Sequence, residues 1–192
     1  MASYSTNEFR KGLKIQIDGV PFQIVEMNFR KPGKGAAFYE CKLKNLMRGT
    51  VVDRTYRDGQ SLEAADISEF TAEYLYRQGE DFVFMNTSDY EQYELSAEQV
   101  GDDWKFMKDN MECTMMVWNN NPISLTLPNH VVLRVEYAEP TAKGNTATNV
   151  QKPVKLETGA EVAAPPFINT GDYLRIDTRT GEYVERTKEP GS

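Results

Sequence analysis

The stretch LKIQIDGVPFQIVEM, residues 13–27, sets the fold class. Apolar and polar side chains alternate on both sides of Asp18-Gly19, and Asp-Gly between two alternating runs is typical of a β-hairpin. The alternation continues in AAFYECKLKNL at 36–46 and in TVVDRTY at 50–56. Together these segments predict the strands of one small, barrel-like sheet.

The same alternation extends along the rest of the chain. Further strands are predicted in AEYLYRQGEDFVFMN (72–86, turning at Gln78-Gly79), CTMMVWNNNPISLTLP (113–128, turning across Asn119 to Pro122), HVVLRVEYAEP (130–140) and YLRIDTRTGEYVERT (173–187, turning at Thr180-Gly181). Many short strands with turns every 8–12 residues are typical of small β-barrels of the SH3-like or OB type.

Two segments differ from this pattern. SLEAADI at 61–67 is interpreted as a junction, and the polar stretch at 96–111 has short helical potential. No predicted helix is long enough for a βαβ unit. The fold class expected is therefore all-β, with boundaries near residues 65 and 128 that give three small domains, 1–65, 66–128 and 129–192.

Charge is distributed unevenly along the 192 residues. The formal net charge is −7, yet residues 1–65 carry +4, residues 66–128 carry −10 and residues 129–192 carry −1. A polarised chain can direct its basic end toward phosphate while its acidic part is repelled. An ordinary solvated basic surface explains the same count, so charge alone leaves both readings open.

Few residues offer self-contained chemistry. Cys41 and Cys113 are far apart in strand-like segments and are expected to be reduced core residues. The single histidine, His130, opens an apolar run and is expected to be structural. The pair Asp102-Asp103 lies in a segment that is acidic throughout and reads as a solvated face. We therefore expect no catalytic residues, no metal site, no cofactor and no enzyme.

One lysine is placed unusually. In FRKPGKGAAF, residues 29–38, Lys34 lies between Gly33 and Gly35 and follows Pro32. Glycines permit backbone conformations that are closed to other residues, and proline stiffens the approach. The sequence resembles a P-loop only superficially, because a strand and not a helix follows. The loop is predicted to hold a modifiable amine away from the body of the domain, although a basic hairpin tip without a role fits the same pattern.

These segments resemble bacterial elongation factor P over essentially the whole chain. The matching segments are KPGKG (31–35), FMN (84–86), WNNNPISLTLPNHVVLRV (118–135) and the long run 152–186, with Lys152, Gly159, Val162, Pro165, Ile168 and Gly171 at the family spacing. Val154 and Ala164 differ from common choices in that run and are interpreted as packing variation.

The resemblance implies a fold and a function. The fold would be an SH3-like (KOW-like) N-terminal domain followed by two OB-fold domains in an elongated, L-shaped, tRNA-like arrangement. The function would be binding to both ribosomal subunits between the P and E sites, beside peptidyl-tRNA, and relief of stalling at consecutive prolines. Lys34, extended by a modifying enzyme of unspecified chemistry, would point toward the peptidyl-transferase centre. A cytoplasmic monomer without membrane contact is expected.

Further residues carry over from the family. Arg30 and Lys31, just before the tip, are candidates for phosphate contact. The stretch Gly144-Asn145-Thr146 resembles a Gly-Asp-Thr loop that contacts RNA near the E-site codon of mRNA, with Asn145 replacing the usual carboxylate.

Tyr183 and Arg186 match a pair associated with RNA contact, although an aromatic and an arginine on a last strand also fit a structural role. The alternative function is a generic RNA-binding β-barrel protein without a role in peptide-bond formation. It predicts salt-sensitive binding to many RNAs.

Overall fold

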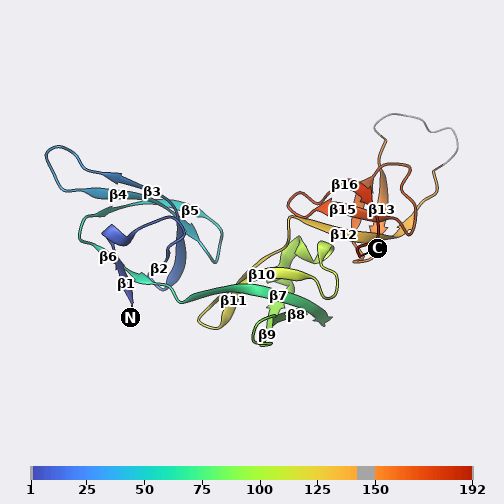
Figure 1. Ribbon diagram of the computed structural model, residues 1–192, viewed down its shortest axis with the longest axis horizontal. Coiled ribbons are helices and arrows are strands. Elements are labelled where there is room, and N and C mark those ends of the chain that lie inside the picture. Colours follow the sequence, from blue (N-terminus) through green and yellow to red (C-terminus); the bar gives the residue numbers. More distant parts are fainter. Residues whose placement is uncertain (1, 142–149, 192) are drawn as a thin grey trace. The chain divides into compact units, whose positions relative to one another are not determined.

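The computed structural model describes residues 2–141 and 150–191, which fold into three antiparallel sheets (Figure 1). Contacts divide the chain into two compact units, one of Met1–Glu69 with Met115–Ser124 and one of Phe70–Thr114 with Leu125–Ser192. The expected all-β class is confirmed. Among the described residues, no helix is long and apolar enough to cross a membrane.

The first sheet has six strands in the order β1-β6-β2-β3-β4-β5. The strands are β1 (Ser3–Ser5), β2 (Lys14–Ile17), β3 (Val20–Arg30), β4 (Phe38–Asn45), β5 (Val51–Arg57) and β6 (Ser61–Ala64), with a 3-10 turn, η1 (Thr6–Glu8), after β1. Asp18-Gly19 turns β2 into β3 with both residues at positive φ, as the Asp-Gly signal predicts. The core lies inside this curled sheet and contains Phe9, Leu13, Ile15, Ile24, Tyr39, Cys41 and Leu43.

The interpretation of residues 61–67 as a junction is wrong for their first part. Their first part is not a connection but strand β6, which pairs with β1 through Tyr4↔Leu62 and with β2 through Ile15↔Ala64. A four-residue strand is too short to show alternation reliably, and the pairing that makes it a strand comes from residues distant in sequence.

The second sheet has the order β11-β10-β7-β8-β9. Its strands are β7 (Ile67–Gln78), β8 (Asp81–Asn86), β9 (Gln92–Ser96), β10 (Glu112–Trp118) and β11 (Asn121–Thr126). The helical potential at 96–111 is realised as one turn of helix, α1 (Ala97–Val100), and a 3-10 segment, η2 (Gly101–Phe106). Ser96 and Gln99 form a capping box that starts α1.

The third sheet has the order β14-β13-β12-β15-β16. Its strands are β12 (His130–Ala138), β13 (Lys152–Leu156), β14 (Glu161–Ala164), β15 (Tyr173–Asp177) and β16 (Glu182–Thr187). Leu133, Leu156 and Ile176 are fully buried in its core. Val154 and Ala164 are buried as well, which agrees with interpreting their departures from the family pattern as packing.

Candidate functional site: the Lys34 hairpin and the C-terminal sheet

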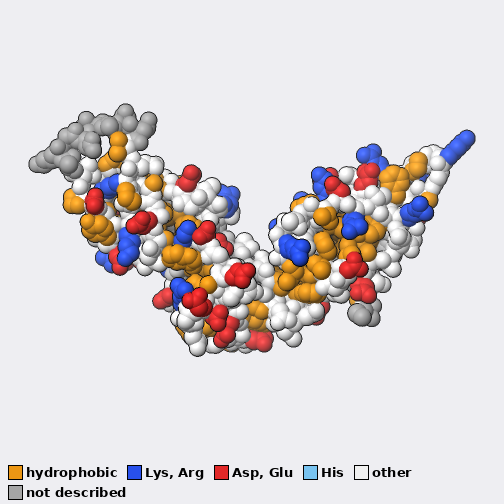
Figure 2. All heavy atoms as spheres, turned by 180° about the vertical axis from the view of Figure 1, so that it is seen from behind, with side chains coloured by type: hydrophobic (Ala, Val, Ile, Leu, Met, Phe, Trp, Pro, Cys, Tyr) orange, Lys and Arg blue, Asp and Glu red, His pale blue; other side chains and the backbone are white. Residues whose placement is uncertain are grey.

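Lys34 lies at the midpoint of the loop between β3 and β4. The last pair of the hairpin is Arg30↔Phe38, so residues 31–37 form the loop and Lys34 is equidistant from both strand ends. Its side chain is exposed and makes no hydrogen bond or ion pair with any described residue. The hairpin extends past the rest of its sheet (Figure 1), and a basic side chain projects from its end (Figure 2).

The two glycines that flank Lys34 differ in conformation. Gly35 has φ +140°, in the region that disfavours side chains, whereas the φ of Gly33 is not in that region. A Cβ at Gly33 would meet open space, and one at Gly35 would lie 3.6 Å from Cγ of Pro32. The sequence-based expectation of special backbone freedom therefore holds at Gly35 alone.

An aromatic ladder braces the stem of the hairpin. Phe29 and Tyr39 are cross-strand partners with ring centroids 5.0 Å apart, and Tyr39 is in turn the partner of Tyr56. Phe9 packs edge-on against both tyrosines, at 6.1 and 5.5 Å. Such pairs contribute about 0.5–1.5 kcal/mol each beyond area burial, and they tie the hairpin to the domain core.

Sequence reasoning did not single out this ladder. The signal was nevertheless present, because Phe29 and Tyr39 are equally distant from Lys34 and must face each other once Lys34 is taken as the loop midpoint.

The cations beside the tip are not equivalent. Nε of Arg30 donates to Oε2 of Glu40 at 3.3 Å, across the hairpin. Lys31 is exposed and has no carboxylate partner in the described part of the chain. The sequence predicts phosphate contact for both Arg30 and Lys31, and the structure adds that Arg30 also pairs with a carboxylate. Such an exposed pair contributes about 0–1 kcal/mol, so a phosphate can compete for this guanidinium.

The C-terminal sheet brings Tyr183 and Arg186 to one face. Residues three apart on a regular strand point to opposite sides, but a bulge in β16 makes Tyr183 the partner of Ile176 and Arg186 the partner of Leu174. Because Leu174 and Ile176 share a face of β15, their partners share it too. Gly144, Asn145 and Thr146 lie outside the described residues.

The residues that frame that segment are described. Nζ of Lys152 donates to the backbone oxygen of Glu139 at 2.6 Å and to Oγ1 of Thr141 at 3.3 Å. Oγ1 of Thr141 donates to the backbone oxygen of Pro166. Lys152, one of the residues at the family spacing, thus fixes the end of the chain that leads out of β12.

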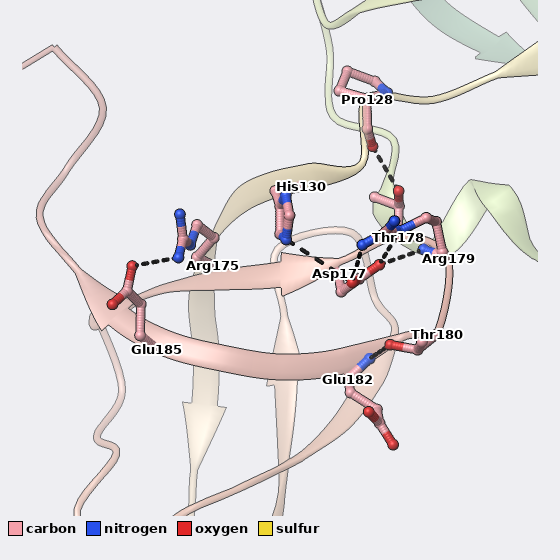
Figure 3. A network of polar contacts seen from close by, with 9 residues as sticks. All are labelled: Pro128, His130, Arg175, Asp177, Thr178, Arg179, Thr180, Glu182 and Glu185. Atoms are coloured by element: carbon pink, nitrogen blue, oxygen red, sulfur yellow. Dashed lines mark hydrogen bonds and ion pairs between the residues drawn. The ribbon is translucent and has the colours of Figure 1, made fainter.

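His130 belongs to a polar network at the end of β15 (Figure 3). Its Nε2 lies 3.9 Å from Oδ2 of Asp177, while Arg179 donates to the same carboxylate from Nε at 3.1 Å and from Nη2 at 2.8 Å. Hydrogen bonds from the side chain and then the backbone of Arg179 lower the pKa of Asp177 to about 2. The network connects β12 to β15, which supports a structural role for His130.

The remaining reactive candidates are inert. Cys41 and Cys113 are free and buried, as expected. Burial raises the pKa of both thiols, and that of Cys113 reaches about 12. Asp102 pairs with Lys105 at 3.1 Å, and burial followed by the charge of Asp102 raises the pKa of Asp103. No group of three potential metal ligands occurs among the residues that the structure describes.

Three family models match consecutive parts of the chain. They are the elongation factor P KOW-like domain at residues 5–62, the elongation factor P OB domain at 67–125 and the elongation factor P C-terminal domain at 131–186. The chain belongs to the elongation factor P family. Two relatives that carry this name come from Rhodopirellula baltica, 55% identical over 97% of this chain and 95% of its own length, and Desulforapulum autotrophicum, 50% identical over 97% and 100%.

Solved structures support the fold. "Eukaryotic translation initiation factor 5A from Methanococcus jannaschii" aligns with a TM-score of 0.53 at 20% identity, covering 66% of this chain and 92% of its own. A factor of the same kind from Naegleria fowleri aligns with a TM-score of 0.50 at 15% identity, covering 66% and 98%. These likenesses agree with the expected KOW-like and OB architecture of elongation factor P.

Membership of the elongation factor P family defines the general activity. The chain is a translation elongation factor that associates with the ribosome, and the family consists of translation factors and not of enzymes.

Proposed function

We propose that this factor binds between the ribosomal P and E sites beside peptidyl-tRNA and stimulates peptide-bond formation on ribosomes stalled at consecutive prolines. Lys34, extended after translation by a modifying enzyme, points toward the peptidyl-transferase centre. The observation that carries the proposal is the exposed Lys34, which has no partner among the described residues, at the midpoint of a braced hairpin. An exposed amine on a protruding loop is also accessible to a modifying enzyme.

Positioning supplies the physical mechanism. Proline is a constrained participant in peptide transfer, and a rigid nascent chain holds the reacting ester out of line. Holding reactants in the correct geometry contributes up to about 7–11 kcal/mol in ideal intramolecular reactions. A factor that orders the acceptor end of a tRNA therefore needs no nucleophile or general base of its own.

The distribution of charge supports an orientation in which the N-terminal segment faces the tRNA. Residues 1–65 are basic and carry Arg30, Lys31 and Lys34, which suits contact with tRNA phosphates. The acidic segment 66–128 limits non-specific binding to RNA. In the last segment we propose contacts to RNA near the E-site codon through Gly144-Asn145-Thr146 and through Tyr183 with Arg186. We also propose that the domains meet near residues 65 and 128. We propose that the factor works in the cytoplasm.

Reconstituted translation of a Pro-Pro-Pro reporter tests the proposal. The factor purified from its own cells is compared with Lys34→Ala and with Lys44→Ala, which removes the same charge from an exposed position on β4. We expect relief of the stall by the native factor and by Lys44→Ala, and none by Lys34→Ala. Mass analysis of the tip peptide then identifies the group on Lys34.

Two outcomes contradict the proposal in different ways. Full activity of Lys34→Ala would show that the tip amine has no role. If no form relieves the stall although all of them bind ribosomes, the chain acts as a generic RNA-binding β-barrel protein and not in peptide-bond formation.

A further inference from the structure

Phe167 is an exposed aromatic residue in the turn between β14 and β15. The residue is 56% exposed, whereas the next residue, Ile168, is completely buried. Single exposed aromatics are common on protein surfaces and need no explanation. What distinguishes Phe167 is the group that the fold holds against its ring.

Arg186 places its guanidinium over the Phe167 ring, 5.4 Å from the ring centroid. Nη1 of the same arginine lies 3.6 Å from Oδ2 of Asp172, and half of the arginine side chain stays exposed. The contacts with a carboxylate and with a ring together orient the planar guanidinium, and half of the side chain stays accessible.

The turn that carries Phe167 is fixed by hydrogen bonds. The backbone N–H of Asn169 donates to Oδ2 of Asp172 at 2.8 Å, and Nδ2 of Asn169 donates to the backbone oxygen of Phe167 at 3.2 Å. The N–H of Gly171 donates to the backbone oxygen of Val135 at 2.9 Å, which ties the turn to β12. A ring mounted on such a turn loses little conformational freedom when a ligand binds.

Two other aromatic residues show what is particular to this arrangement. Arg77 lies over the ring of Phe82 at 5.1 Å, but Phe82 is buried and that pair serves the core of its own sheet. Tyr137 on β12 is as exposed as Phe167, at 56%, but no cation lies over its ring in the described part of the chain. Phe167 combines an exposed ring with an exposed, oriented cation.

We propose that Phe167 and Arg186 form a stacking platform for an unpaired base of single-stranded RNA. Aromatic rings and guanidinium planes stack on any base, and the guanidinium adds attraction to the neighbouring phosphate. The inference rests on the proposed function, since the ribosome supplies the RNA. It deepens that function by naming Phe167, which neither the sequence pattern nor the comparisons assign.

The test measures the dissociation constant of the factor from ribosomes carrying mRNA and P-site tRNA, at several KCl concentrations. Phe167→Ala should raise the constant by about 5- to 100-fold at every salt concentration without changing the salt slope, because stacking releases no counterion. Arg186→Gln should raise it and also lower the slope by about one. Tyr137→Ala, the matched exposed aromatic, should bind like the native factor.

Rescue variants separate stacking from a simple apolar contact. Phe167→Trp should restore affinity and Phe167→Leu should not, while thermal melting checks that each variant is folded. Native-like binding of Phe167→Ala, or equal rescue by Leu and Trp, would overturn the platform. A photoreactive benzoylphenylalanine at position 167 should crosslink to RNA, and crosslinks to ribosomal protein alone would overturn it as well.

Failure of this inference is distinguishable from failure of the proposed function. If the native factor relieves the Pro-Pro-Pro stall through Lys34 and Phe167→Ala binds normally, only the platform is wrong. If Lys34→Ala is fully active, the proposed function fails whatever the result at Phe167.

Discussion

The ring of Phe29 lies 5.0 Å from the ring of Tyr39, at an interplanar angle of 53°, and the two residues are direct cross-strand partners in the Lys34 hairpin. This contact is the outermost member of the aromatic ladder. It connects the buried core to a loop in which residues 31–36 are exposed.

Removing the outer ring should loosen the tip. Because Phe29 is 52% exposed, we expect Phe29→Ala to lower the free energy of unfolding by only about 0.5–1.5 kcal/mol. The fractional loss of stimulation on the Pro-Pro-Pro reporter should exceed the fractional loss of unfolding free energy, since the tip amine would sample more positions. Phe29→Tyr keeps the ring and serves as the control. Full activity of Phe29→Ala would show that the ladder does not position Lys34.

The two tip glycines should respond differently to the same substitution. At Gly35, φ is +140°, and an alanine there carries backbone strain of about 1–3 kcal/mol. At Gly33, φ is ordinary and the added methyl group meets open space. Gly35→Ala should therefore impair stimulation in the reporter assay, and Gly33→Ala should not. Equal activity of the two variants would contradict a requirement for this loop conformation.

Glu40 should act as a competitor for Arg30. In Glu40→Gln the guanidinium loses its carboxylate partner, so it becomes fully available to phosphate. We expect tighter ribosome binding and a salt slope steeper by about one, with unfolding stability almost unchanged. Glu63→Gln removes the same charge from an exposed position on β6 and is the control. Arg30→Gln should weaken binding, and unchanged affinity in both Arg30→Gln and Glu40→Gln would exclude a phosphate contact at Arg30.

Asp177 should make the stability of the third sheet sensitive to acid. Its pKa is lowered from 3.8 to about 2 by Arg179, so the stabilisation is present above the unfolded-state pKa and is lost as pH falls through the folded-state pKa. Asp177→Asn should be less stable than the native chain at pH 7. The difference in unfolding free energy between the two should narrow below about pH 4.

Urea unfolding at a series of pH values measures that gap. Glu161→Gln, an exposed carboxylate of the same sheet without an ion pair among the described residues, should show no comparable change. A gap for Asp177→Asn that stays constant down to pH 2 would assign its effect to packing and not to charge.

Strong local patterns predicted much of this fold. The alternation around Asp18-Gly19 and around Thr180-Gly181 encodes both the strands and the turns of their hairpins, since Gly at positive φ is required there. β6 was missed because its strand character comes from pairing with β1 and β2, and four residues carry little pattern of their own.

The candidate site also combines features that the local sequence predicts with features that depend on contacts between distant residues. The place of Lys34 at a loop midpoint is readable from residues 29–38 alone. The ion pair of Arg30 with Glu40 depends on strand register, and the shared face of Tyr183 and Arg186 depends on a bulge. Neither a register shift nor the cation held over Phe167 leaves a local signature, because both arise from contacts between segments that are separate in the sequence.

The isolation of Lys34 has a consequence for how the cell handles this protein. If Lys34 is extended as proposed, a group attached to its Nζ breaks no contact with a described residue, so the bare and the extended forms should share one folding equilibrium. Chaperones and proteases sort proteins by their unfolded fraction and therefore treat the two forms alike. Under the proposed modification, the supply of the modifying enzyme, and not protein turnover, should then set how much of the protein carries the longer side chain.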